Sequence, residues 1–332
     1  MGKSTTGKCW IGFDLGGTKM LAEVFDSEDR VTGKNRRKTR GNGEGEKPMD
    51  RIVGTIDAAL SDAGRSREDL AGIGMGVPGP LDIEKGILLE SFNLGWDALP
   101  LKATLEKVFK CPVSVANDVD AGVYGEYRFG AAAGARCAVG LFPGTGVGGG
   151  CVYEGRILRG QRHSCFEIGH CQVMPDGPLC GCGQRGCLEA VASRLAVSSA
   201  VAAAAFRGEA PHLLAAQGTD LSRIRSKALA TAIAEGDRAV ELIVRDAARW
   251  LGVGVATAVS LVAPDIVVLG GGMVEAMPEI FLEETRRSAR ARVMETLRPS
   301  FKVCIARLGD SAATLGAAAW ARACVEKTSG RA

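Results

Sequence analysis

The sequence has no apolar stretch long enough to span a bilayer. Its first eight residues are polar and lead directly into the apolar run 9–13, without the apolar core and small-residue cleavage site of a signal peptide. We therefore expect a cytoplasmic protein. The formal net charge is only +3, which favours neither nucleic acid nor an anionic membrane as the main partner.

Two familiar kinds of nucleotide-binding motif are also missing. None of the internal glycine-rich turns ends in Gly-Lys-Ser or Gly-Lys-Thr, as a P-loop does. No Gly-x-Gly-x-x-Gly joins an opening strand to a helix in the manner of a dinucleotide-binding fold. A disulfide framework is disfavoured, because the 11 cysteines are odd in number and irregularly spaced. Reduced thiols together with a metal site fit this pattern better.

What the sequence does contain is an alternation of strand and helix patterns. At 332 residues the chain is too long for one comfortable core. A strand–turn–strand pattern begins at residue 9 and returns at residue 137, with helical spacing at 49–63, 101–109 and 118–129 between them. We expect an α/β protein with two domains, residues 1–132 and 133–332. The last helix, from about residue 312, is a candidate to pack back on the first domain.

Glycine-rich turns between strands are the first candidates for a phosphate site. One is Asp14-Leu15-Gly16-Gly17-Thr18-Lys19, and the other begins Gly144-Thr145-Gly146. Glycine lets backbone N–H groups approach a phosphate closely, Thr18 adds a hydroxyl, and Asp14 can hold Mg²⁺ through water. One such turn alone reads equally well as a hairpin with a capping Asp. Two such turns at corresponding places in the two domains indicate a cleft whose two walls bind the triphosphate of ATP.

A third glycine cluster, Gly270-Gly271-Gly272, follows the apolar run 266–269. Close backbone approach at this cluster suits an adenosine group. By itself the cluster reads equally well as the entry to a helix, so its interpretation depends on the two turns above.

One histidine and three cysteines form the sharpest cluster of the sequence: His170, Cys180, Cys182 and Cys187, with glycines between them. Four such ligands can close a tetrahedral zinc site with no open position, which makes the site structural. It would hold a loop that has too few apolar residues to fold alone. Cys165 and Cys171 are alternative ligands, and the remaining possibility is a group of free thiols beside an unrelated histidine.

Asp118 is the candidate catalytic residue. It follows the apolar run 113–116 and begins a helix, so it is either a helix N-cap or a general base that takes the proton of an acceptor hydroxyl. Phosphoryl transfer needs mainly positioning and electrostatics, so one carboxylate at the acceptor suffices. Other polar residues stand at turns or element boundaries, where each is either a cap or a sugar ligand: Asn93, Asn117, Glu167 and Glu189.

These motifs resemble those of the ROK sugar kinases and repressors, within the acetate and sugar kinase/Hsp70/actin superfamily. The resemblance runs from about residue 10 to residue 320. Its most specific parts are the stretches 14–19, 116–118, 144–150, 167–170 and 180–189.

The resemblance implies two ribonuclease-H-like (actin-like ATPase) domains around a central cleft that closes over ATP-Mg²⁺ and a hexose. It makes Asp118 the catalytic base and lets His170 bind zinc with one ring nitrogen and the sugar with the other. Family members are commonly dimers or tetramers. The implied sugar contacts are Gly79, Asn93, Asn117, Glu167, His170 and Glu189. The implied ATP contacts are Asp14, Gly16, Gly17, Thr18, Lys19, Gly144, Thr145, Gly146, Gly270, Gly271 and Gly272.

The expected reaction is therefore phosphorylation of a hexose at its 6-hydroxyl, with glucose first among the acceptors. A kinase for an N-acetylated amino sugar or fructose has the same pocket residues and is the alternative within the class. The rival class is a sugar-responsive repressor, which carries a helix-turn-helix that we do not expect here, since nine residues precede Trp10. One departure from the family pattern, His163-Ser164-Cys165-Phe166 where glycines are usual, falls on the sugar side of the pocket.

Overall fold

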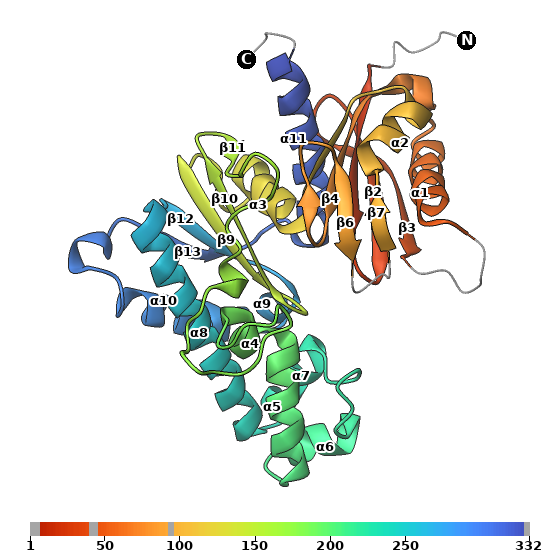
Figure 1. The fold of residues 1–332 in the computed structure, drawn as a ribbon. Helices are drawn as coiled ribbons and strands as arrows, with labels where there is room; N and C mark the ends of the chain where they lie inside the picture. Colours follow the sequence, from red (N-terminus) through yellow and green to blue (C-terminus); the bar gives the residue numbers. More distant parts are fainter. Residues whose placement is uncertain (1–6, 40–45, 92–95, 329–332) are drawn as a thin grey trace. The chain divides into compact units, whose positions relative to one another are not determined.

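The computed structural model describes residues 7–39, 46–91 and 96–328 (Figure 1). Within these ranges, no helix combines the length and the apolar character needed to cross a membrane. The chain divides into two compact units. The first comprises residues 1–134, 155–165 and 310–332, and the second comprises residues 135–154 and 166–309. This division differs from the expected boundary at 132/133, because residues 155–165 and 310–332 belong to the first unit.

The sheet of the first unit contains β1 (Cys9–Leu15), β2 (Lys19–Phe25), β3 (Val31–Lys38), β4 (Leu70–Val77) and β8 (Val113–Asn117). Their order across the sheet is β3-β2-β1-β4-β8. β1 pairs antiparallel with β2 and parallel with β4, which pairs parallel with β8. β1 and β4 are almost wholly buried, which explains their near-continuous apolar runs.

Helices cover both faces of this sheet: α1 (Pro48–Asp62), α2 (Leu101–Phe109), α3 (Asp118–Phe129) and α11 (Ala312–Thr328), with the short turns η1 (Arg67–Asp69) and η4 (Gly309–Ser311). In α1, Ile52, Ile56 and Leu60 repeat at a spacing of one helical turn and are buried in the core. They share that core with Ile11 and Phe13 of β1. α1 therefore covers the face of the sheet to which the odd-numbered side chains of β1 point.

The C-terminal helix α11 packs on the other face. Trp10 of β1 shares a core with Ala318 and Ala321 of α11. Gly12 and Gly74 permit the close approach, because a methyl group on either glycine would lie 1.9 Å from a backbone oxygen of α11. In Figure 1 this dark blue helix lies against the strands coloured red and orange, which are the N-terminal strands of the same unit.

A small sheet that the sequence did not predict follows β4. It consists of β5 (Leu81–Asp82), β6 (Ile87–Ser91) and β7 (Trp96–Leu99), paired antiparallel in that order. The segment 155–165, which includes β11 (Arg156–Ile157), belongs to the same unit. Ile83 N donates to Arg162 O at 2.7 Å, which ties this segment to the first unit. Asn93, one of the expected sugar ligands, lies outside the described residues.

The second unit repeats the strand pattern of the first. Within it β9 (Cys137–Pro143), β10 (Val147–Tyr153), β12 (Ile266–Leu269) and β13 (Lys302–Ile305) follow the order β10-β9-β12-β13. β9 pairs antiparallel with β10 and parallel with β12, as β1 does with β2 and β4. This order of a hairpin followed by parallel strands is the ribonuclease-H-like pattern, so the expected α/β fold class is confirmed.

The helices of the second unit are α4 (Leu188–Ala192), α5 (Arg194–Phe206), α6 (Pro211–Gln217), α7 (Ser226–Ala234), α8 (Arg238–Val262), α9 (Gly272–Ala276) and α10 (Pro278–Arg290), with η2 (Ile168–His170) and η3 (Glu295–Leu297). Val244, Leu251 and Val255 of α8 are fully buried in the core beneath the sheet. α5, α6 and α7 gather at one end of this unit (Figure 1). That end carries the features discussed below.

Candidate active site

Two carboxylates of the first unit lie on either side of β4. Asp14 in β1 pairs with Gly76 of β4. Asp118 begins α3 directly after β8, and its Cα would lie 3.3 Å from a methyl group on Gly76. Burial raises the pKa of Asp14 to about 7, helped by the negative charges of Asp118 and Asp310. Carboxylates that repel one another in this way form a site that a divalent cation stabilises.

The N-cap of α3 is Asn117, which corrects the alternative interpretation of Asp118 as the cap. Asn117 Oδ1 accepts hydrogen bonds from Val119 N at 2.9 Å and from Asp120 N at 3.3 Å. Asp118 is the first helical residue, and its Oδ1 accepts from Val119 N at 2.9 Å. The helix start therefore orients Asp118.

The first glycine turn joins β1 to β2. Thr39 supports it, because its Oγ1 donates to Gly16 O at 2.6 Å and its N donates to Thr18 O at 2.9 Å. A methyl group on Gly16 would lie 2.5 Å from Lys19 O, whereas one on Gly17 would meet nothing within 4 Å. Gly17, Thr18 and Lys19 are exposed. The backbone fold thus requires glycine at position 16, and Gly17 leaves open space through which a phosphate can approach.

The second glycine turn joins β9 to β10 and has the same division of roles. Gly144 N donates to Gly146 O at 2.9 Å, which closes the turn. Glu189 Oε2 accepts from Val147 N at 2.9 Å, and a methyl group on Gly146 would lie 2.1 Å from that oxygen. A methyl group on Gly144 would meet nothing within 4 Å. Glu189 is therefore a structural support of this turn.

Arg194 contacts the same turn, and the sequence analysis missed it. It is the first residue of α5, and its backbone N donates to Gly144 O at 2.9 Å. Its guanidinium donates to Thr145 Oγ1 at 3.0 Å. Ser193 caps the helix by accepting from Ala196 N at 3.1 Å. A serine before an apolar helical run is a start signal that would have placed Arg194 at a helix N-terminus.

The third glycine cluster lies beside the second turn. Gly271 has φ +84° and precedes α9. A methyl group on Gly270 would lie 2.9 Å from the ring of Phe142, and one on Gly271 would lie 2.9 Å from Pro143 O. Phe142 and Pro143 end β9, directly before Gly144. The two glycine clusters expected to bind ATP in the second unit are thus neighbours.

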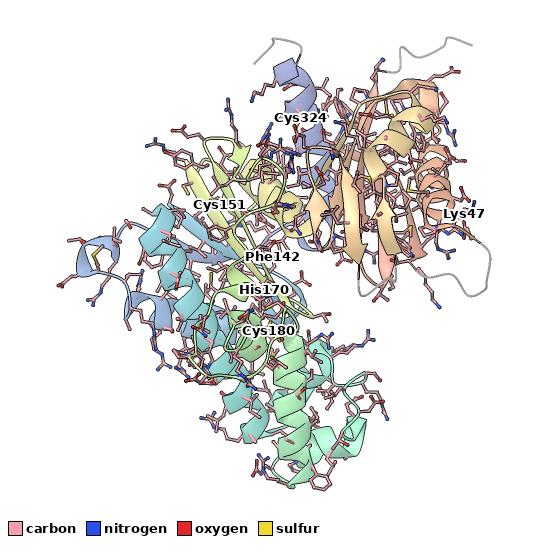
Figure 2. All side chains as sticks on the ribbon, in the orientation of Figure 1. Lys47, Phe142, Cys151, His170, Cys180 and Cys324 are labelled. Carbon is pink, nitrogen blue, oxygen red and sulfur yellow. The ribbon has the colours of Figure 1, made fainter. Side chains whose placement is uncertain are left out.

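The histidine and three cysteines come together as the sequence predicted. His170 Nδ1 lies 3.7 Å from Cys180 Sγ, and Cys182 Sγ lies 3.7 Å from Cys187 Sγ. The four ligand atoms all lie within 4.8 Å of one another. Zinc bonds to sulfur and nitrogen place tetrahedral ligands roughly 3.6–3.8 Å apart. The donor types and their spacing therefore fit zinc, and Figure 2 shows His170 and Cys180 side by side.

The alternative ligands do not take part in this cluster. Cys165 belongs to the first unit, where its thiol donates to Leu158 O at 2.8 Å. Cys171 is exposed and is not among the four grouped residues. All 11 cysteines of the chain lie in the described ranges, and none of them forms a disulfide there.

The expected sugar ligands divide between the two units. Glu167 and His170 flank η2, and His170 N donates to Glu167 O at 3.0 Å. Glu189 lies beside them, since its Oε1 accepts from the Cys180 thiol at 3.6 Å. In the first unit, Asn117 precedes Asp118, and Gly79, with φ +91°, follows β4.

The unusual segment 163–166 has a glycine-like backbone at its last residue. Phe166 has φ +65°, a conformation that glycine adopts readily and that strains a bulky residue. Its side chain packs on the core of the second unit, against Ile168 and the position of Gly149. His163 Nδ1 lies 3.0 Å from Leu81 O, and Ser164 donates to Asp120, both in the first unit.

Comparison with known proteins agrees with this arrangement. The ROK family model matches residues 10–324. A glucokinase from Streptomyces coelicolor is 34% identical over 315 residues, covering 94% of this chain and 97% of the relative. A ROK family glucokinase from Streptomyces griseus, solved with glucose and AMPPNP, has a TM-score of 0.81 and 34% identity over 95% of this chain and 99% of its own. A xylose repressor from Caldicellulosiruptor bescii is 29% identical, over 82% of this chain and 67% of the repressor. This chain belongs to the ROK family.

Proposed function

We propose that this protein transfers the γ-phosphoryl group of ATP to the 6-hydroxyl of glucose. The glucokinase name of the Streptomyces coelicolor relative and the glucose and AMPPNP bound by the Streptomyces griseus enzyme support this choice. The observation that carries it is the juxtaposition of Asp14 and Asp118 beside the first glycine turn. A kinase needs carboxylates for its metal and its acceptor, whereas a regulator that only senses a sugar needs neither.

Asp118 is the general base of the proposed reaction. It accepts the proton of the 6-hydroxyl while that oxygen bonds to the γ-phosphorus, and the electrons of the broken bond leave on ADP. Its fixed place at the start of α3 orients it without a further ligand. The proposed sugar contacts are Gly79, Asn93 and Asn117 from the first unit and Glu167, His170 and Glu189 from the second.

Backbone amides of the glycine turns bind the nucleotide in this proposal. Gly16, Gly17, Thr18 and Lys19 serve in the first unit, and Gly144, Thr145 and Gly146 serve in the second, with Gly270, Gly271 and Gly272 at the adenosine. Asp14 is the residue that holds Mg²⁺, through water. When bound, the ion neutralises charge on the phosphates. A buried carboxylate with a pKa of about 7 fits this role, because it gains a counterion when the metal arrives.

A structural zinc ion is part of the proposal, held by His170, Cys180, Cys182 and Cys187. The interatomic spacing described above supports it. Zinc on Nδ1 of His170 would fix the tautomer and orient Nε2 for a sugar hydroxyl. Glu189 connects this cluster to the second glycine turn, because one of its oxygens contacts Cys180 and the other contacts Val147 N.

We also propose a cytoplasmic location, where ATP is available, and a homodimer or homotetramer, as is common in the family. Light scattering on the purified protein measures the oligomeric state directly, and a monomer at working concentration would contradict that part of the proposal.

A coupled ADP-release assay across sugars tests the function. The panel is glucose, N-acetylglucosamine, N-acetylmannosamine, mannose, fructose and allose, each with ATP-Mg²⁺. We expect kcat/KM to be highest for glucose. A preference for an N-acetylated amino sugar or for fructose would replace glucose and direct attention to the segment around Phe166. Sugar binding without turnover on any of them would favour a regulator.

A further inference from the structure

Cationic side chains without a carboxylate partner gather beside the second glycine turn. Arg194 donates to Thr145, and Arg225 donates through Nε to Ser222 O at 3.0 Å. In the part of the chain that the structure describes, neither guanidinium takes part in an ion pair with Asp or Glu. Other arginines of this unit do take part in such ion pairs, as Arg245 does with Glu241 and Glu284.

The local electrostatics oppose this placement in the absence of a ligand. Arg194 begins α5, and Arg225 immediately precedes α7. Neither helix has an acidic residue in its first turn, so each cation faces the positive end of a helix with no counter-charge on that helix. Burial lowers the pKa of Arg194, and the positive charge of Arg225 lowers it further. An anion bound beside Arg194 would relieve its repulsion from Arg225 and the repulsion between each arginine and the positive end of its helix.

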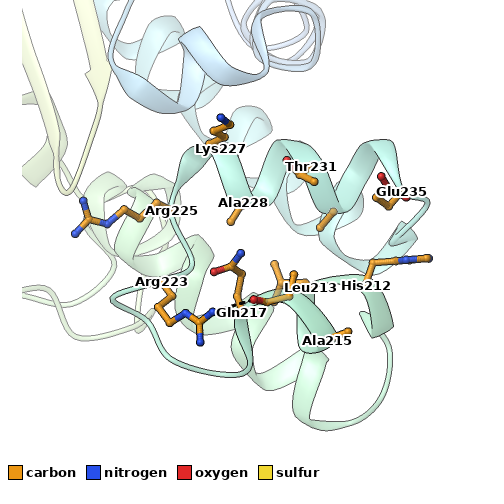
Figure 3. Close-up of a pocket in the computed structure, with 12 residues that line it drawn as sticks. His212, Leu213, Ala215, Gln217, Arg223, Arg225, Lys227, Ala228, Thr231 and Glu235 are labelled. Carbon is orange, nitrogen blue, oxygen red and sulfur yellow. Dashed lines mark hydrogen bonds between the residues drawn. The ribbon is translucent and has the colours of Figure 1, made fainter.

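The loop before α7 brings further positive charge to the same region. Arg223, Arg225 and Lys227 line a cavity of about 690 Å³ between α6 and α7 (Figure 3). Arg223 is already engaged in the loop, since its guanidinium donates to Ala216 O at 3.0 Å. In Figure 3 the side chain of Arg225 extends away from Arg223 and Gln217 rather than toward them.

The elements next to Arg194 and Arg225 indicate which anion would bind there. The second glycine turn and the third glycine cluster, Gly270 to Gly272, adjoin each other at Pro143. Ser226, the first residue of α7, would lie 3.6 Å from a methyl group on Gly272. The starts of α5 and α7 therefore border the proposed nucleotide contacts on two sides. A nucleotide phosphate placed on the open side of Gly144 would lie next to Thr145 and the Arg194 guanidinium.

We propose that Arg194 binds a phosphate group of the nucleotide directly, and that Arg225 is a second cation for the same phosphates. This inference rests on the proposed kinase function. Guanidinium groups bind phosphate through paired, charge-assisted hydrogen bonds, which makes Arg194 more than a support for the turn. Phosphate binding also explains why Arg194, which begins α5 and contacts the second glycine turn, has no carboxylate beside it.

Calorimetric titration of the full-length protein with ADP and with adenosine tests the inference. We expect Arg194→Met to raise the Kd of ADP by about 10- to 100-fold and to leave the Kd of adenosine unchanged. Arg225→Met should raise the Kd of ADP by a smaller factor of about 3 to 10. Arg223→Met is the matched control, with the same change of charge in the same loop, and should change the Kd of ADP less than twofold. Equal ADP affinity in wild type and Arg194→Met would overturn the inference.

Thermal unfolding separates a ligand-binding role from a structural one. If Arg194 serves the phosphate, the ligand-free Arg194→Met protein unfolds at the same or a higher temperature, because repulsion from Arg225 and from the start of α5 is removed. A clear fall in Tm, together with equal losses for ADP and adenosine, would mean that Arg194 only holds the turn and would overturn the inference. Wild type that binds no adenine nucleotide would overturn the proposed function as well, whereas nucleotide binding unaffected by Arg194→Met overturns this inference alone.

Discussion

The two glycine turns share a backbone design but differ in the sign of the charge around them. In the first unit, the negative charges of Asp118 and Asp310 act on Asp14 at the end of β1, directly before the turn to β2, and Arg36 pairs with Asp310. In the second, Arg194 and Arg225 bring positive charge to the turn between β9 and β10. The order β2-β1-β4-β8 in the first unit corresponds to the order β10-β9-β12-β13 in the second. In our proposal, the same fold therefore carries the metal ligand and the proton acceptor beside one turn and the phosphate-binding arginines beside the other.

This difference shows what a repeated fold can and cannot specify. The hairpin supplies backbone N–H groups in both turns. A methyl group on Gly16 would meet the backbone at Lys19 O, and one on Gly146 would meet the carboxylate of Glu189. The side chains that complete each site come from elsewhere: Asp118 from the start of α3, and Arg194 from the start of α5. Chemistry therefore depends on which residues begin the helices next to the turns.

The largest expected effect comes from the acidic side of the comparison. Asp118→Asn should lower kcat for glucose phosphorylation by about two to four orders of magnitude, because the acceptor hydroxyl loses its general base. Glucose affinity should change little. Asp50→Asn is the matched control, since Asp50 is also a carboxylate in the first turn of a helix, far from the turns in sequence. Initial rates by ADP release measure both. Turnover of Asp118→Asn near that of wild type would remove Asp118 from the chemistry.

Metal removal tests the second unit separately. Taking zinc from the cluster with a strong chelator, or replacing Cys182 by Ser, should weaken glucose affinity by about 10- to 100-fold, because His170 and Glu189 lose their orientation. Cys171→Ser, an exposed thiol outside the cluster, is the control. Metal content by atomic emission and glucose affinity by calorimetry are the measurements. Metal-free protein with unchanged glucose affinity and stability would contradict the structural zinc.

The pH dependence of stability probes the acidic site itself. The pKa of Asp14 is raised from 3.8 to about 7. Between about pH 4 and pH 7, Asp14 therefore keeps its proton in the folded protein but has lost it in the unfolded chain. The free energy of unfolding decreases as pH rises through this range. Asp14→Asn should stabilise the metal-free protein at pH 8 by about 2 kcal/mol, below a ceiling of about 4 kcal/mol.

Asp14→Asn should give no gain near pH 4, where the carboxyl is protonated in the folded state. Mg²⁺ affinity of the wild type should rise with pH through about 7, since the metal binds the ionised form of Asp14. The free energies of unfolding of wild type and Asp14→Asn, measured in urea at pH 4 and pH 8, test the stability effect. A gain of equal size at pH 4 and pH 8 would contradict the raised pKa.

Replacing single glycines in the two turns is expected to give the smallest effects. Gly16→Ala and Gly146→Ala should each destabilise the protein by about 1–3 kcal/mol, because the new methyl group meets Lys19 O or Glu189. Gly17→Ala and Gly144→Ala meet nothing within 4 Å and should keep wild-type stability while weakening ADP binding. Thermal unfolding with and without ADP distinguishes the pairs. Equal destabilisation within a pair would mean that the open glycines are also structural.

Features that depend on local spacing were predictable from the sequence. The strands on each side of the glycine turns, the start of α3 at Asp118, and the His170 and cysteine cluster all follow from neighbouring residues. The strands β5 to β7 were not predicted, because runs of two to five residues between glycines and prolines have too little periodicity.

Features that depend on tertiary contacts were beyond the sequence. Arg194 was missed because its partner Thr145 lies 49 positions away. Phe166 stood out as a departure from the family pattern, but its positive φ is a backbone property imposed by the surrounding core. The return of residues 155–165 to the first unit likewise rests on contacts such as that of Arg162 with Ile83, which no local pattern encodes.

The most direct test of the account is simultaneous measurement of ADP and glucose 6-phosphate formed by the purified protein from ATP, Mg²⁺ and glucose. We predict one ADP for each glucose 6-phosphate, with ADP formation strongly dependent on glucose and almost absent in Asp118→Asn. ADP release that does not depend on glucose, or glucose binding without any phosphorylated product, would contradict the assignment of a glucose kinase with Asp118 as its base.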